Sequence, residues 1–251
     1  MNSNVENNDF KVKSLAKAMN ILECFTSEHP ELGVTDIAKM TGLHKSSVHN
    51  MISTFCDMGY VSFNPDNSRY YLGLRLLHFG YIINTHLGIR NIFLPYMQKI
   101  ANTVLENAYL GIPDGSNVLY IEAMAPHGAP ARNILGERAP LYCTGLGKAM
   151  LAHLHDYDNR IPEMKAFTDN TISSRETLLA DLEQTRLRGY AVDNMEHEYG
   201  VKCVALPIFG HTGEVIAAIS VSAPSLRMSA EAVESIVHSM TALLAPIQRV
   251  L

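Results

Sequence analysis

The stretch that decides the fold is VTDIAKMTGLHKSSVHNMI, residues 34–52. Its first part has apolar residues at helical spacing and ends at Gly42, which breaks the helix and supplies a turn. We expect Thr35 to cap this short helix. A second helix is predicted from about Lys45 to Met58. Its apolar stripe consists of Val48, Met51, Ile52 and Phe55. Two helices joined by such a turn predict a helix-turn-helix.

The flanking sequence extends this motif to a winged helix-turn-helix. Upstream, apolar residues at helical spacing between Val12 and Phe25 predict one amphipathic helix. Downstream, alternating residues at 60–63, an Asn-Pro-Asp-Asn turn and alternating residues at 69–72 predict a two-stranded hairpin, the wing. Residues 1–10 are rich in Asn and lack periodicity, so we expect a disordered lead. Residues 11–73 are therefore assigned to a winged helix-turn-helix domain.

The rest of the chain predicts a linker helix and a second domain. Residues 74–88, LRLLHFGYIINTHLG, are apolar around more of the helix than one facing water tolerates. We interpret them as a linker helix that pairs with another chain. Residues 89–251 alternate helical and strand patterns, which favours one α/β domain with a central, largely antiparallel sheet. The predicted fold class is thus α+β.

The second helix of the motif carries the candidate contacts to double-stranded DNA. Its side opposite Val48 is small and polar, which suits the major groove, and Asn can pair with an adenine edge. The chain has no acidic residue between Asp36 and Asp57. Phosphate contacts are expected from Thr35, Lys45, Ser46 and Ser47, with Arg69 in the wing reaching the DNA backbone or minor groove. The predicted DNA-binding residues are Thr35, Lys45, Ser46, Ser47, His49, Asn50 and Arg69. A solvated helix face is the alternative, preferred for Ser53 and Thr54.

Composition limits the function classes. The 251 residues include 25 Asp and Glu against 20 Lys and Arg, a formal charge of −5, which excludes a protein that coats nucleic acid or anionic membrane by bulk charge. DNA binding must then be site-specific and multimeric. Four cysteines without a C-x-x-C pair indicate reduced thiols, and the absence of a signal peptide or long apolar run predicts a cytoplasmic protein away from membranes. The histidines lack zinc-site spacing, so we expect no metal and no cofactor.

Several motifs together resemble the IclR family of bacterial transcriptional regulators. In the first domain they are VKSL (12–15), LHKSSV (43–48), GYV (59–61) and RYYLG (69–73). In the second they are PLYCTGLGKA (140–149) and GYAVDN (189–194), followed by Glu196, Gly200, Val201 and Cys203. Two positions depart from the family pattern: Asn50 stands where many members carry Arg, and Met195 where an acid is common. The first departure concerns the operator sequence and leaves the mode of binding unchanged.

The resemblance implies a GAF-like second domain that binds a small metabolite, often an organic acid, in a homodimer or homotetramer. The residues themselves agree with this: Gly145 to Lys148 begin a helix whose backbone N–H groups can hold a carboxylate. Ser220 and Ser222 point to one side of a predicted strand. Carried over from the family motif, the effector-binding residues are Ala131, Gly145, Leu146, Asp193, Cys203, Ser220 and Ser222. The alternative is that each of these residues has only a structural role, such as a hydrogen bond to neighbouring backbone or packing in the core.

Two other functions compete with that of a regulator. Cys203 with Asp193 and either His197 or His211 could form the nucleophile, orienter and base of a thiol-dependent hydrolase. Cys203 lies in an apolar strand pattern, however, whereas catalytic thiols need electropositive, partly exposed sites. An assembly protein that uses the winged helix only to dimerise is the other alternative, and the acid-free window argues against it. We therefore expect the protein to be a transcriptional regulator controlled by an effector, and not an enzyme. We expect it to act as a repressor.

Overall fold

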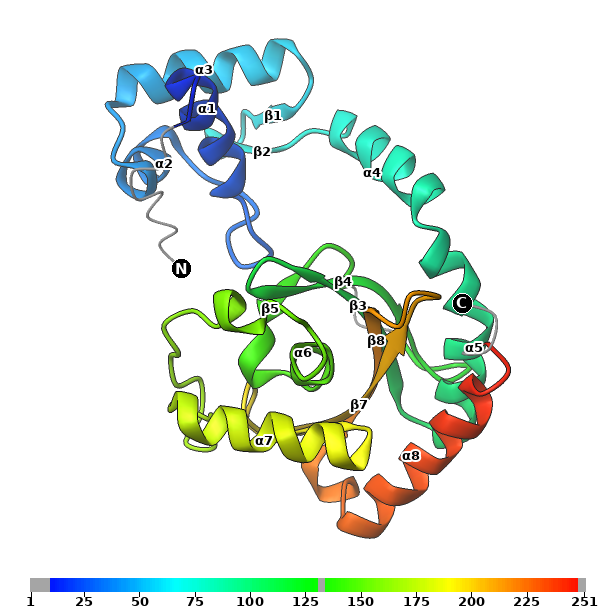
Figure 1. The fold of residues 1–251 in the computed structure, drawn as a ribbon. Helices are drawn as coiled ribbons and strands as arrows, with labels where there is room; N and C mark the ends of the chain where they lie inside the picture. Colours follow the sequence, from blue (N-terminus) through cyan, green and yellow to red (C-terminus); the bar gives the residue numbers. More distant parts are fainter. Residues whose placement is uncertain (1–9, 131–133, 248–251) are drawn as a thin grey trace. The chain divides into compact units, whose positions relative to one another are not determined.

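The computed structural model describes residues 10–130 and 134–247 (Figure 1). The predicted disordered lead, apart from Phe10, lies outside the described residues, as does Ala131. The chain divides into two compact units, Met1–Leu87 and Gly88–Leu251, which are described separately. No described helix is both long and apolar enough to cross a membrane.

The first unit is a winged helix-turn-helix, as predicted. Its elements in chain order are α1 (Lys13–Glu23), α2 (Val34–Thr41), α3 (Lys45–Asp57), β1 (Val61–Asn64), β2 (Arg69–Leu72) and α4 (Arg75–His86). β1 and β2 pair antiparallel, with Val61 opposite Leu72. Each of the first three helices contributes a fully buried side chain to one core, and the wing closes it; these residues are Ile21, Ile37, Val48, Ile52 and Val61.

The two ends of α2 show what the sequence did and did not reveal. Gly42 ends the helix in the left-handed conformation, at φ 69°, as expected of a residue without a side chain. The prediction that Thr35 caps α2 was wrong, because the N-cap is Gly33. The backbone N–H of Gly33 donates to the carboxylate of Asp36 at 3.2 Å, so an acid three residues along the chain secures this end. Thr35 instead lies exposed in the first turn.

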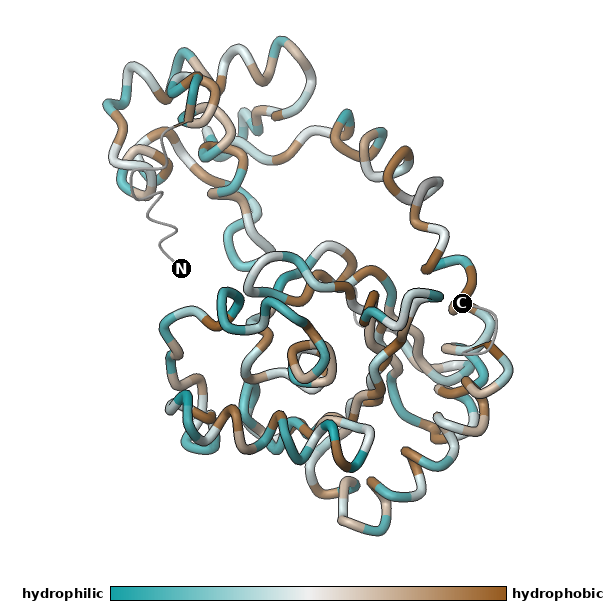
Figure 2. The backbone as a smooth tube through the Cα atoms, in the orientation of Figure 1, coloured by the Kyte–Doolittle hydropathy of each residue, from teal (hydrophilic) through white to brown (hydrophobic). Residues whose placement is uncertain are grey.

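Helix α4 is held at its start and exposes apolar side chains along its length. The Arg75 guanidinium donates to the backbone carbonyl of Met58 at 2.7 Å and lies 5.1 Å from the ring centroid of Tyr60. Beyond it, apolar residues recur on successive turns (Figure 2), and Leu77 and Tyr81 are 69% and 68% exposed. The predicted linker helix therefore forms, with the apolar surface that led us to expect a partner chain.

The second unit is built on one antiparallel sheet with helices on both faces. Its helices are α5 (Gly88–Val104), α6 (Gly145–Leu151), α7 (Arg175–Arg188) and α8 (Ala230–Leu244). Its strands are β3 (Asn107–Asp114), β4 (Asn117–Met124), β5 (Arg138–Pro140), β6 (Ala191–Asn194), β7 (Val201–Phe209) and β8 (Val215–Pro224), in the spatial order β5-β4-β3-β8-β7-β6. Every pairing is antiparallel, as expected. The three-residue strand β5 was not predicted.

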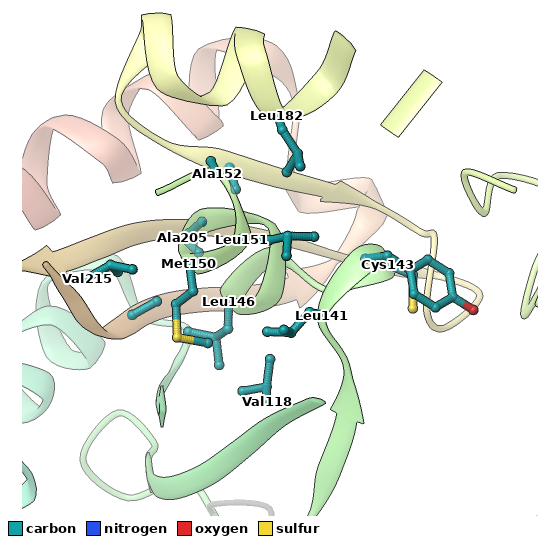
Figure 3. Packing of buried hydrophobic residues seen from close by; sticks show 14 of the residues in the cluster. Val118, Leu141, Cys143, Leu146, Met150, Leu151, Ala152, Leu182, Ala205 and Val215 are labelled. Atoms are coloured by element: carbon teal, nitrogen blue, oxygen red, sulfur yellow. The ribbon is translucent and has the colours of Figure 1, made fainter. Parts of the chain in front are cut away.

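The sheet curls around α6, and α7 packs against α6. Helices α5 and α8 cover the opposite face of the sheet (Figure 1). Leu146 and Met150 of α6 pack with sheet residues such as Val118, and Leu182 of α7 points toward Ala152 (Figure 3). The start of α6 depends on a glycine, because a Cβ at Gly147 would lie 2.2 Å from the carbonyl oxygen of Leu141. This close approach fixes where α6 begins over the sheet.

Candidate functional site

The exposed face of α3 is polar and free of acidic residues in its first turn. Lys45, Ser46, His49 and Asn50 are exposed, and Ser47 is half-buried beside the core residue Val48. The buried positions lock the helix to the rest of the unit, so the exposed side chains project from a rigid element. Such a helix, with small polar groups near its leading end, has the chemistry needed to enter a major groove.

The wing is fastened to the segment before α2 by contacts that the sequence pattern did not reveal. Arg69 donates to the backbone carbonyl of Glu31 at 2.9 Å, and its guanidinium lies 3.5 Å from the Asp36 carboxylate. The side-chain amides of Asn64 and Asn67 both donate to the carboxylate of Glu31. Arg69 therefore positions the wing, although a guanidinium has five N–H donors and can still meet a phosphate.

The second unit contains a cavity of about 320 Å³, partly open to solvent, over one face of the sheet. The structure brings six of the seven predicted effector-binding residues to its wall, namely Gly145, Leu146, Asp193, Cys203, Ser220 and Ser222. The seventh, Ala131, lies outside the described residues. The wall also contains residues that the sequence analysis did not single out, among them Asn107, Tyr109, Tyr120, Glu137 and Arg138.

Strand register explains why residues far apart in the sequence meet here. Asp193 on β6 pairs with Cys203 on β7, Cys203 with Ser222 on β8, and Ser222 with Asn107 on β3. Residues directly opposite in antiparallel strands point to the same face, so these four side chains form one row across four strands. Ser220 belongs to the parallel row two residues along β8. The polar floor of the cavity follows from this pairing.

The two serine hydroxyls are poorly satisfied by the protein. Ser222 donates to the thiol sulfur of Cys203 at 2.9 Å, and sulfur is a weak acceptor. Ser220 is only 2% exposed and lines the cavity, and within residues 10–130 and 134–247 its hydroxyl has no hydrogen-bond partner. Because buried polar groups in native proteins are almost always paired, this hydroxyl is available to a water molecule or a ligand in the cavity.

Asp193 joins the cavity to a buried charge cluster. Asp193 is only 4% exposed, and its Oδ1 accepts a hydrogen bond from the backbone N–H of Glu196 at 2.7 Å. Burial is the main cause that raises the pKa of Asp193 to about 7, and the neighbouring carboxylate of Glu196 adds to it. Asp193 therefore changes its charge near neutral pH, which is uncommon for an aspartate.

The partners of Glu196 come from two helices. Its Oε1 accepts from Lys148 Nζ of α6 at 2.6 Å, and the same Nζ lies 2.8 Å from Asp181 of α7. Lys148 is 1% exposed, and burial raises the pKa of Glu196 despite this ion pair. From the sequence, Lys148 and Glu196 were recognised only as positions of the family motifs, and Asp181 was not predicted. A lysine inside the apolar run of α6 was the signal available.

The beginning of α6 faces Cys203. A Cβ at Gly145 would lie 3.1 Å from the Cβ of Cys203, so this glycine keeps the helix close to the polar row. The N–H of Gly147 already donates to the Thr144 hydroxyl at 3.1 Å. Among the described residues, the N–H groups of Gly145 and Leu146 have no acceptor, so both are available to a hydrogen-bond acceptor at this end of the helix.

The thiols do not resemble nucleophiles. Burial raises the pKa of Cys203 well above that of an ordinary thiol, and the nearby Asp193 raises it further. Cys143 is also held protonated, chiefly by burial. A protonated thiol beside a carboxylate is the reverse of the electropositive setting that activates cysteine. Within the described part of the chain, no group of three His, Cys, Asp or Glu side chains could hold a metal ion.

The sequence models of known families match both units. That of the IclR helix-turn-helix domain matches residues 14–65, and that of the bacterial transcriptional regulator IclR C-terminal domain matches residues 82–248. The chain belongs to the IclR family. The HTH-type transcriptional regulator XynR of Escherichia coli (strain K12) is 36% identical over 222 residues, which cover 86% of this chain and 88% of XynR.

Solved structures of IclR proteins share the fold. The Thermotoga maritima IclR crystal structure is 30% identical, has a TM-score of 0.71 and covers 94% of this chain and 98% of its own. An IclR homologue from Microbacterium hydrocarbonoxydans, complexed with 4-hydroxybenzoate, is 23% identical with a TM-score of 0.76, covering 92% and 97%. The protein is therefore an IclR-type transcriptional regulator with a DNA-binding helix-turn-helix domain, and its relatives are regulators rather than enzymes.

Proposed function

We propose that this IclR-family regulator is a site-specific repressor whose hold on operator DNA is controlled by a small organic acid bound in the cavity of the second unit. The observation that carries the effector half is the Ser220 hydroxyl, which belongs to a buried residue in the wall of a cavity that Asp193 also lines. Repression is the simpler mode, since occupying an operator excludes polymerase without a further contact surface.

The first unit supplies the DNA contacts in this proposal. Asn50 reads an adenine edge in the major groove, Lys45 forms a salt bridge with a phosphate, and Ser46, Ser47 and Thr35 donate to phosphates. His49 lies on the same exposed stretch, and Arg69 brings the wing to the backbone or minor groove. With so few cations per subunit, affinity depends on two or more copies bound to one site.

Self-association is the second part of the proposal. The exposed apolar side chains of α4 support pairing with a second copy, because soluble monomers rarely leave such a surface uncovered. We propose a homodimer formed through the DNA-binding domain and α4, with the effector domain able to extend it to a tetramer. Two recognition helices would then read two half-sites related by symmetry.

The acid is held, in this proposal, by groups from both sides of the cavity. The N–H groups of Gly145 and Leu146 donate to its carboxylate, while Asp193, Ser220 and Ser222 bind its hydroxyl or carbonyl groups. That the Microbacterium homologue is complexed with 4-hydroxybenzoate, itself an organic acid, supports a ligand of this kind.

Thermal-shift screening of the full chain against small organic acids tests the effector half. A stabilising acid should lose its effect in both Asp193→Ala and Ser222→Ala, and should keep it in Ser235→Ala, an exposed serine on α8. Stabilisation unchanged by both cavity variants would place the site elsewhere. A winged-helix assembly protein, the alternative, would show no binding to any DNA fragment.

A further inference from the structure

We infer that Arg75 and Tyr60 are positioning residues that fix the direction of α3 relative to α4 and thereby set the spacing of the two half-sites that a dimer recognises. The inference rests on two parts of the proposed function, namely that α3 reads DNA and that α4 pairs two copies of the chain. It concerns the connection between these two helices, which lies wholly within the first unit. We call this connection, residues 58–60 and 73–75, the junction.

The backbone of the junction brings the end of α3 against the start of α4. The wing hairpin lies between these helices in the chain, and its two ends meet where the N–H of Gly73 donates to the carbonyl of Tyr60 at 2.8 Å. A Cβ at Gly73 would lie only 2.3 Å from the carbonyl oxygen of Gly59, so this approach requires a residue without a side chain. The chain therefore leaves α3 and enters α4 at neighbouring points.

Arg75, the first residue of α4, reaches back to the end of α3. Its Nη1 donates to the backbone carbonyl of Met58, the C-cap of α3, at 2.7 Å. Carbonyl groups at a helix C-terminus have no partner within the helix and carry partial negative charge, so a guanidinium suits them. The same guanidinium lies 5.1 Å from the ring centroid of Tyr60. One side chain of α4 thus contacts both the end of α3 and the residue that follows it into the wing.

Three aromatic rings make a second connection between the helices. Phe55 in the last turn of α3 meets Tyr60 edge to face, with ring centroids 6.4 Å apart, and Tyr60 lies 5.9 Å from Phe79 of α4. Aromatic pairs at these separations attract each other beyond the effect of area burial alone. Tyr60 therefore contacts the rings of both helices as well as the Arg75 guanidinium. Contacts at two separate points on α4 resist a rotation that one contact would permit.

The length of α3 converts a small rotation at the junction into a large displacement at the DNA. The residues proposed to contact DNA on α3 begin at Lys45, 13 residues before Met58, or roughly 20 Å along the helix. A rotation of about 10° at the junction would move that end by roughly 3 Å, close to the rise of one base pair, about 3.4 Å. In a dimer paired through α4, the two-fold axis repeats this movement in the second copy. The separation of the two reading ends would then change by about two base pairs.

Inverted repeats that differ only in spacer length test the inference. Fluorescence anisotropy with the full chain would compare duplexes that carry the half-site preferred by the wild type, with spacers varied one base pair at a time. The wild type should bind one spacer at least tenfold more tightly than spacers two base pairs longer or shorter. This preference is the quantity that the junction is expected to control.

Two variants remove the contacts of the junction independently. Arg75→Met and Tyr60→Leu keep an apolar side chain of similar reach, so circular dichroism and light scattering should show the wild-type fold and mass. Each should reduce the preference for one spacer to about threefold or less, while the base preference within each half-site stays as in the wild type. Arg227→Met is the matched control, because it removes an exposed guanidinium from an ion pair in the second unit, and it should keep the wild-type spacer profile.

The outcomes separate this inference from the proposed function. A wild-type spacer profile in either variant would overturn the role of that residue and leave DNA binding by a dimer standing. Weaker binding of Arg75→Met at every spacer, with a salt dependence lowered by about one phosphate contact, would make Arg75 a DNA contact instead. A lower mass in light scattering would give the residue a role in pairing instead of direction. A wild type without preference for any inverted repeat would contradict the proposed dimer as well.

Discussion

Replacing Asp193 with Asn should leave the stability of the protein unchanged near pH 4 and should stabilise the protein increasingly as the pH rises toward 7. An aspartate in the unfolded chain ionises near its ordinary pKa of 3.8, whereas burial raises that of Asp193 to about 7. Between these values the folded state holds a proton that the unfolded state has lost, so the free energy of unfolding falls as pH rises through the window. A shift of about 3 units at about 1.36 kcal/mol each gives a ceiling of about 4 kcal/mol.

Asn cannot ionise, and its side-chain oxygen can still accept the N–H of Glu196. Asp193→Asn and the wild type should therefore have the same free energy of unfolding near pH 4. At pH 7.5 the free energy of unfolding of the variant should be higher by up to about 4 kcal/mol. Because the chain has no Trp, urea titrations followed by far-UV circular dichroism at several pH values would measure this. Hydrogen exchange in β7 and β8 would assign the change to the second unit.

The matched control is Asp169→Asn, an exposed carboxyl between α6 and α7. It should follow the wild type at every pH. If the free energy of unfolding of Asp193→Asn has the same pH dependence as that of the wild type between pH 4 and 7.5, then Asp193 is ionised throughout this range. Burial would then not raise the pKa of Asp193.

Four further substitutions test other parts of the molecule. Lys45→Glu should weaken binding to all DNA in fluorescence anisotropy, whereas Asn50→Ala should relax preference at about one position per half-site, by roughly 1–3 kcal/mol; unaltered binding by both would remove these contacts. Leu77→Glu should lower the mass measured by light scattering, and an unchanged oligomer would exclude α4 from the interface. Gly147→Ala should destabilise the second unit by ~3 kcal/mol, because its Cβ would meet the Leu141 carbonyl; a wild-type melting temperature would contradict this.

Most of the fold could be predicted because its signals are local. The apolar stripe of α3 and the left-handed Gly42 are visible within a few residues of sequence, and each has the predicted place in the structure. The cap of α2 was misassigned because Thr35 has a capping side chain but lies two residues after the N-cap, while Gly33 has no side chain and relies on Asp36. The strand β5 was not predicted because a pattern of three residues is too short to recognise.

The effector cavity depended on more than local pattern. Six of its residues came from the family resemblance, and the register of β6, β7 and β8 shows why they converge. Asn107 was missed because its place in the polar row is set by a partner strand more than a hundred residues away. The pairing of Lys148 with Glu196, 48 residues apart, and of Arg69 with Glu31, 38 residues apart, was missed for a similar reason, since such distant contacts leave no periodic pattern in the sequence.

The central claim is that α3 directs this protein to specific sites on DNA. The most direct measurement is recovery and sequencing of genomic fragments bound by the purified full chain, with Lys45→Glu as the matched comparison. The wild type should enrich a small set of fragments that share one inverted-repeat sequence, and the variant should lose them. Fragments without a common sequence, or the same set recovered by Lys45→Glu, would contradict it.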